Sequence, residues 1–109
     1  MAYDNQLAER IRDLLQDQSD LDERPTSGGL YFILDGHLCC GVSGDMLMAR
    51  VGPHAYEDCL GQPWVSEMDF TGKALAGVVF VAPQALVDDA ALADWVHRCA
   101  NFVNTLPAP

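Results

Sequence analysis

The sequence predicts an α+β domain, an antiparallel β-meander with helices packed on it, formed by residues 1–109 as a single domain. Three observations predict this class. A helix-spaced apolar stripe lies near each end of the chain, strand-like runs lie between them, and Asp35-Gly36 separates two of those runs. We expect the element order α-β-β-β-α-β-α.

The first element is an amphipathic helix over residues 3–16. Its apolar residues recur at the i, i+4, i+7, i+8 spacing of a single helix face: Leu7, Ile11, Leu14 and Leu15. The stretch "QDQSDLDERPTSGG" then breaks the pattern with acids, serines and a proline. We expect a loop there, with a short edge strand near residues 24–26 as the alternative.

The meander occupies residues 29–51. Asp and Gly tolerate the positive φ angles of a two-residue hairpin turn, so the chain is expected to reverse at Asp35-Gly36. The expected pairs are Leu34–His37, Ile33–Leu38, Phe32–Cys39 and Tyr31–Cys40. This register places Tyr31, Ile33, Leu38, Cys40 and Val42 on one face, and Leu30, Phe32, Leu34 and Cys39 on the other. A turn at 43–45 leads to a third strand at 46–51.

The second half begins with a short helix at about 54–60, which Gly52-Pro53 opens. A loop or irregular edge follows, then a β-branched and aromatic strand at 77–81. Asp88 is expected to cap a last helix that runs to about residue 104. The apolar stripe of that helix is formed by Leu92, Trp95, Val96, Cys99, Phe102 and Val103.

The charge balance argues against autonomous nucleic-acid binding. Six basic residues face sixteen acidic ones, the formal net charge is −10, and Lys73 is the only lysine. Proteins that grip a duplex usually cluster Lys and Arg. A basic protein partner suits this charge better.

The chain is expected to be cytoplasmic and to have no membrane partner. No apolar run is long enough to span a bilayer, and the amino terminus carries acids where a secretory signal needs a basic end. The four cysteines show no disulfide or C-x-x-C spacing, so they are expected to be reduced, buried thiols: Cys39, Cys40, Cys59 and Cys99.

The segment "LDGHLCC" raises the possibility of a metal or redox site. Strand alternation would place His37 and Cys39 on one face and Cys40 on the other, so at most two of the three could reach one ion. A structural zinc site needs four ligands. We therefore expect no metal and no cofactor.

Two strings imitate enzyme motifs and fail. "GVSGD" at 41–45 has Asp45 where a nucleophile elbow needs glycine, and "FTGKA" at 70–74 lacks both the first glycine and the Ser or Thr of a phosphate loop. We predict no catalytic residue, which favours a non-enzymatic protein.

Four residues are candidates for ligand binding between the sheet and the helices: Arg50, Tyr31, Tyr56 and Trp64. Arg50 follows apolar positions on its strand and could anchor an anion, the alternative being a salt bridge to Glu57 or Asp58. Trp64 follows a proline in a loop, and an exposed Trp64 would indicate a contact surface. A small-molecule binder or an enzyme with a pocket lined by these residues is the alternative function.

Both predicted faces of the meander carry apolar residues, although two helices can cover only one face of a small sheet. The other face needs the short helix or a second copy of the protein. We therefore expect a homodimer.

Several segments resemble the TfoX/Sxy N-terminal domain family: Gly28-Gly29, Gly41-Val42, Arg50-Val51-Gly52-Pro53, Ala55-Tyr56 and Met68-Asp69-Phe70-Thr71-Gly72. The resemblance covers nearly the whole chain. It implies an α+β domain without accepted catalytic residues. The family takes its name from regulators of natural competence, which join this domain to a carboxy-terminal one, so we expect a stand-alone copy here.

The chain departs from the family at two places. Thr26-Ser27 stands where the family usually has Met-Phe, and Asp35-Gly36-His37 stands where it favours Asn-Gly-Asn. The second change keeps the turn chemistry. We expect a non-enzymatic protein-interaction module, of the transcription or competence regulator type, that acts through protein partners.

Overall fold

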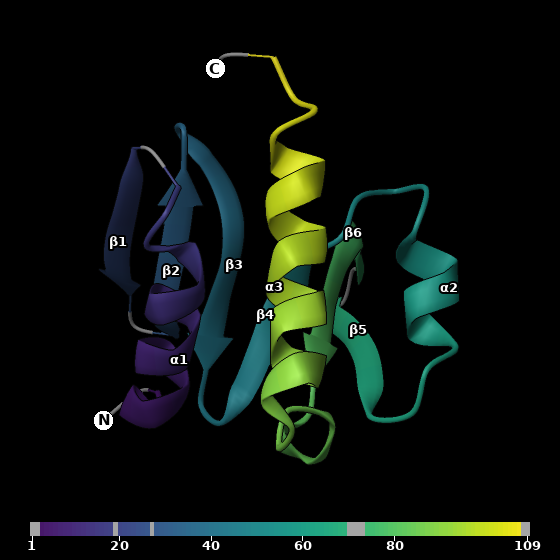
Figure 1. The fold of residues 1–109 in the computed structure, drawn as a ribbon. Coiled ribbons are helices and arrows are strands. Elements are labelled where there is room, and N and C mark those ends of the chain that lie inside the picture. Colours follow the sequence, from purple (N-terminus) through teal and green to yellow (C-terminus); the bar gives the residue numbers. More distant parts are fainter. Residues whose placement is uncertain (1–2, 19, 27, 70–73, 108–109) are drawn as a thin grey trace.

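The computed structural model describes residues 3–18, 20–26, 28–69 and 74–107 and confirms the α+β class (Figure 1). The helices are α1 (Asn5–Leu15), α2 (Tyr56–Leu60) and α3 (Asp89–Val103), with a 3-10 turn at Pro83–Ala85. The strands are β1 (Leu21–Thr26), β2 (Gly29–Leu34), β3 (His37–Ser43), β4 (Met46–Arg50), β5 (Val65–Asp69) and β6 (Ala74–Val81). They form one antiparallel sheet in the order β1-β2-β3-β4-β6-β5.

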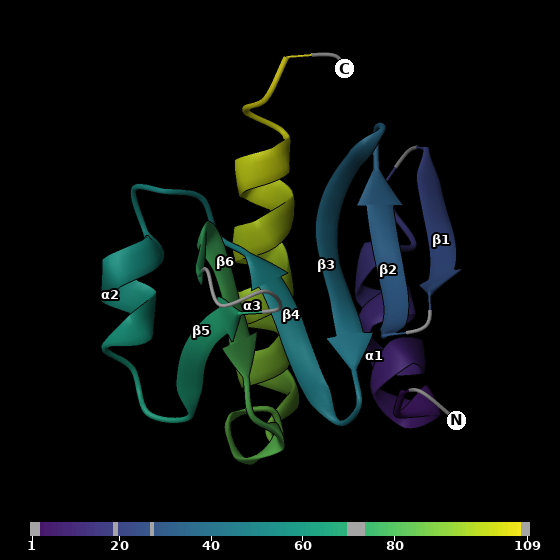
Figure 2. The ribbon, with the colours of Figure 1, turned by 180° about the vertical axis from the view of Figure 1, so that it is seen from behind.

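The sheet has one helix-covered face and one face over which no described helix passes. Helices α1 and α3 lie across the first face, and the view from behind shows the strands in front of both helices (Figures 1 and 2). The short helix α2 lies at the side of the sheet where β5 is the edge strand. We call the second face the helix-free face. None of the helices in the described ranges has the length and apolarity needed to cross a bilayer.

Strands β1 and β5 are additions to the expected element order. The sequence predicts a loop here, with a short edge strand near residues 24–26 as the alternative. The edge strand forms and is longer, because all six residues of β1 pair with β2, from Leu21–Leu34 to Thr26–Gly29. An ion pair fastens it to α1, with Arg12 Nε 2.5 Å from one oxygen of Glu23 and Nη2 2.7 Å from the other. An exposed edge strand needs few apolar side chains, and this explains why the sequence pattern missed it.

The hairpin turn forms as predicted, but the register beyond it differs. Asp35 and Gly36 have φ angles of 52° and 82°, and the first two pairs are those expected. A β-bulge follows, so that Phe32 pairs with Cys40 and Tyr31 with Gly41. The predicted faces of Cys40 and Val42 were therefore wrong. One extra residue in a strand moves every later side chain to the opposite face, and both residues are buried in the core.

The main core lies between the helix-covered face and the two long helices. The predicted stripes supply most of the helix side: Leu7, Ile11 and Leu15 from α1, and Leu92, Trp95, Val96, Cys99 and Val103 from α3. Aspartates cap both helices, because Asp4 Oδ1 accepts from Gln6 N at 2.9 Å and Asp88 Oδ1 from Ala90 N at 3.1 Å. The helix-free face holds a smaller cluster of Met48 and Val78 with Tyr31, Leu38 and Phe80.

Candidate functional site

Trp64 lies in the loop between α2 and β5, and its side chain is 57% exposed. Its φ angle is +67°, a conformation that bulky residues rarely adopt. The backbone is held there because Trp64 O accepts a hydrogen bond from Ala82 N at 2.8 Å and the next residue, Val65, pairs with Val81. Sheet pairing thus fixes a strained residue that presents an indole to solvent.

The segment that joins β6 to α3 is adjacent to Trp64 and carries a second exposed apolar side chain. Leu86 is buried, whereas Val87 is 80% exposed. Val87 directly precedes the cap residue Asp88, a position from which an apolar side chain often packs on the first turns of the helix. Its exposure shows that Val87 does not serve the helix in this way.

A cavity of about 210 Å³ lies between this segment and the start of α1. Its lining consists of Asp4, Gln6, Leu7, Arg10, Asp45, Pro83, Leu86 and Val87. Arg10 closes one side, because its Nη2 lies 2.8 Å from Leu86 O and 2.9 Å from Asp89 Oδ1. No sequence pattern indicates this cavity, since its walls come from segments that are 76 positions apart along the chain at the Arg10–Leu86 contact.

Arg50, the predicted anion anchor, connects β4 to β3 where the pairing of these two strands has ended. The two strands pair only from Cys40–Ala49 to Ser43–Met46 and diverge beyond that segment (Figure 2). Arg50 Nη1 donates to Leu38 O at 3.2 Å, and its guanidinium lies 5.5 Å from the centre of the Phe102 ring. The ion pairs of the described residues do not include a bond from Arg50 to Glu57 or Asp58.

The other predicted ligand-binding residues lie elsewhere. Tyr31 is on the helix-free face with Met48, and Tyr56 is on α2. The Tyr56 hydroxyl is buried with no hydrogen-bond partner among the described residues. Burial, and then the charge of Glu67, raise the pKa of Tyr56. Arg50 pairs with Val78 in the middle of β6, whereas Trp64 precedes the Val65–Val81 pair at the end of that strand.

The four thiols are buried and free. The hydrogen bond between Cys39 and Cys40 lowers the pKa of Cys39, and the positive charge of Arg50 lowers it further, against the effect of burial. Burial raises the pKa of Cys99. Within the ranges that the structure describes, no three His, Cys, Asp or Glu side chains are arranged to hold a metal ion.

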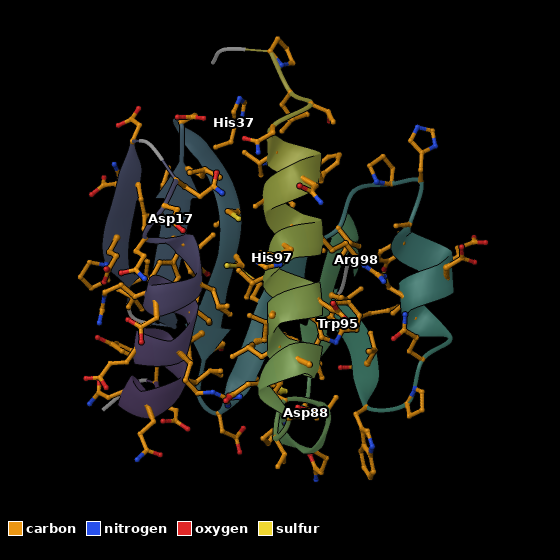
Figure 3. All side chains as sticks on the ribbon, viewed as in Figure 1. Asp17, His37, Asp88, Trp95, His97 and Arg98 are labelled. Carbon is orange, nitrogen blue, oxygen red and sulfur yellow. The ribbon has the colours of Figure 1, made fainter. Side chains whose placement is uncertain are left out.

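His37 and Cys59 each contact a residue of another part of the chain. His37 lies at the hairpin end, opposite the end where α3 begins at Asp88 (Figure 3). The Nε2 atom of His37 is 2.7 Å from Pro107 O. Arg98 Nη1 donates to Cys59 Sγ at 3.0 Å while its guanidinium stacks on Trp95 at 5.1 Å, which fastens α2 to α3. These contacts hold elements together.

The glycines that carry the family resemblance permit close packing. A Cβ atom on Gly29 would lie 1.9 Å from Val42 O of the neighbouring strand. Gly52 has a φ of +89°, and a Cβ there would lie 2.6 Å from the Phe102 ring. These motif positions therefore serve the fold, and the exposed positions at Trp64 and Val87 lie outside the motifs.

Comparison with known proteins gives one match. The family model described as the TfoX N-terminal domain matches residues 13–103. No curated protein and no solved structure matches the chain.

Proposed function

We propose that the chain, which belongs to the TfoX N-terminal domain family, is a non-enzymatic protein-interaction module that acts in regulation through protein partners. The observation that carries the proposal is Trp64, an indole that is 57% exposed on a strained backbone. Tryptophan is enriched among the residues that dominate binding energy at protein interfaces. A strained backbone costs folding free energy, and residues in such conformations cluster at functional sites.

Charge supports a protein partner over a nucleic acid. Six basic residues against sixteen acidic ones give a net charge of −10, which disfavours binding to the dense negative charge of a duplex. We place the protein in the cytoplasm, where its four free thiols are compatible with a reducing environment. A regulatory role of the transcription or competence type rests on the family membership.

We further propose that the helix-free face binds a second copy of the chain. Tyr31, Ile33, Leu38 and Phe80 are only partly buried there, although they are large and apolar. Sedimentation equilibrium at micromolar concentration is expected to give twice the 11.9 kDa chain mass, and Ile33→Lys to give the monomer mass. A monomeric wild type would contradict this proposal.

Binding of a small anion at Arg50 is the second candidate function. One observation favours it, because the described ion pairs do not supply Arg50 with a carboxylate partner. The cavities of about 210, 270 and 290 Å³ do not include Arg50 in their linings. They are also smaller than most small-molecule sites, which measure about 300–1,000 Å³. We therefore rank the interaction module first.

The test is affinity capture from native lysate with the whole chain as bait. Wild type is expected to retain a specific protein, and Trp64→Ser to lose most of it, because the exposed indole is removed without disturbing the core. Asn101→Ser, an exposed change on α3, is the matched control and should retain the protein. Failure of wild type to retain any specific protein would refute the proposal, as would tight duplex DNA binding at physiological salt.

A further inference from the structure

One end of the molecule gathers features that fit a specific kind of partner. We propose that this end binds a protein segment presenting one large apolar side chain next to Lys or Arg side chains. We call it the acidic end surface, and it consists of Asp4, Leu7, Asp45, Trp64, Pro83, Val87, Asp88 and Asp89. The inference rests on the proposed function, because it specifies where the partner binds and what the partner presents.

The surface is assembled from four segments that meet at the same end. The start of α1, the β3–β4 turn, the start of β5 and the segment before α3 all lie there (Figure 1). Backbone hydrogen bonds fix their positions, from Asp4 N to Gly44 O at 2.7 Å and from Ala82 N to Trp64 O at 2.8 Å. The surface is therefore preformed, which lowers the entropic cost of binding.

The apolar part of the surface is unusual for this chain. Among the described residues, Trp64 and Val87 are the two large hydrophobic residues that are mostly exposed to solvent, at 57% and 80%. Trp64 is bonded to Ala82 at the start of the segment from Ala82 to Val87, and Val87 is the last residue of that segment. Two exposed apolar residues at one end, one of which, Val87, also lines a partly apolar cavity, are typical of a binding site.

The cavity accommodates the apolar anchor of the partner. Leu7, Pro83, Leu86 and Val87 form its apolar walls, and its volume is about 210 Å³. This volume is below the range of small-molecule pockets and suits a single side chain. An inserted Leu or Phe would bury apolar surface against these four residues, as anchor residues at protein interfaces do.

The charges around the cavity select a basic partner. Asp4 and Asp45 line the cavity, and Asp88 and Asp89 begin the adjacent helix. Arg10 is the basic residue of the cavity lining, and its guanidinium is already bonded to Asp89 and to Leu86 O. The surface therefore carries an excess of negative charge, which attracts Lys and Arg and repels acidic segments. A second copy of this acidic chain, or an anionic lipid surface, fits poorly.

The experiment is an amide chemical-shift titration of the whole ¹⁵N-labelled chain with synthetic 12-residue peptides. The probe alternates Leu with Lys, and the two control peptides replace Lys by Glu or Leu by Ser. The Leu–Lys peptide is expected to shift the amides of Leu7, Leu86 and Val87 in a saturable way. Val87→Ser is expected to weaken its binding by roughly fivefold or more, as loss of one interface contact does, whereas Asn101→Ser should not.

Three results would overturn the inference: shifts centred on the helix-free face, equal shifts with the Ser–Lys peptide, or no effect of Val87→Ser. Because Val87 is 80% exposed, this variant is expected to keep the dispersed spectrum of the folded protein. Lysate capture separates this inference from the proposed function. If wild type and Val87→Asp retain the same protein equally, the interaction module stands and the acidic end surface is refuted. If wild type retains nothing specific, the proposed function fails.

Discussion

Phe32 and Ile33 are neighbours on β2, yet they occupy opposite faces of the sheet. Phe32 is 0% exposed and packs under the helices, whereas Ile33 is only partly buried on the helix-free face. The main core cluster belongs almost entirely to the helix-covered face. This difference teaches that one face supplies the stability of the fold, which leaves the other face and the acidic end surface available for contacts.

The largest expected effect compares these two neighbours directly. Phe32→Ala is expected to lower the free energy of unfolding by about 3–5 kcal/mol, because it leaves a cavity in a closed core. Ile33→Ala is expected to cost only about 1 kcal/mol at protein concentrations low enough to keep the chain monomeric, because in the single chain this side chain already contacts solvent. Urea unfolding of both variants measures the difference. Equal losses would contradict the division of roles between the two faces.

A second comparison sets a crowded glycine against an open one. Gly52→Ala is expected to cost about 2–3 kcal/mol, because it combines left-handed backbone strain with a clash against the Phe102 ring. Gly44→Ala, at φ +58° with no atom within 4 Å, should cost only the strain, about 1 kcal/mol. Thermal unfolding of the two variants compares these costs. A Gly44 variant as unstable as the Gly52 variant would show that packing against Phe102 is unimportant.

Loss of the Arg50 contact with β3 is expected to have a smaller effect on stability. Arg50→Met is expected to cost about 1–2 kcal/mol, because Leu38 O loses its donor while remaining partly buried. Arg24→Met is the control, since Arg24 is exposed and forms only a 3.6 Å pair with Asp22, so its loss should cost at most about 0.5 kcal/mol. Urea unfolding of both variants measures the difference. Equal stabilities would show that the Arg50 bond to Leu38 O does not stabilise the fold, which would favour the anion-binding role of Arg50.

The smallest effect concerns the tie between α1 and β1. Glu23→Gln is expected to cost about 0.5 kcal/mol at pH 7, because the ion pair with Arg12 is well formed but exposed to solvent. The bond to Arg12 lowers the pKa of Glu23, so the contribution is present above the ordinary glutamate pKa of about 4.3. It is lost as the pH falls through the lowered value.

Urea unfolding of wild type and Glu23→Gln at pH 7 and at pH 2.5 checks this assignment. The two proteins should differ at pH 7 and converge at pH 2.5, where Glu23 is protonated. A difference that persists at pH 2.5 would show that the substitution acts through packing and not through charge.

The sequence predicted those parts of the fold that depend on local periodicity. Helices α1 and α3 lie within two residues of the expected ends, and Asp88 caps α3 as predicted. The sequence predicts mainly loop or irregular edge at β1 and β5, because neither segment has the apolar pattern of a strand. Pairing with β2 and with β6 holds these two strands in the sheet.

The candidate site was only partly predictable. The sequence indicates that Trp64 marks a contact surface if it is exposed, since a tryptophan after a proline in a loop belongs to no apolar stripe. Val87 was not recognised, because its position before a helix cap is usually occupied by a residue that packs on the helix. Only the fold shows that it faces solvent.

By itself the sequence determined the helices, the Asp35-Gly36 turn and the acidic character of the chain, since each depends on side chains within a few positions or on a simple sum of charges. The bulge between the Ile33–Leu38 and Phe32–Cys40 pairs, which turned Cys40 and Val42 toward the helices, depends on the tertiary structure. The tertiary structure also decided the partner of Arg50 and the assembly of the acidic end surface from distant segments. Such features depend on which strands and loops become neighbours, and no local pattern encodes that.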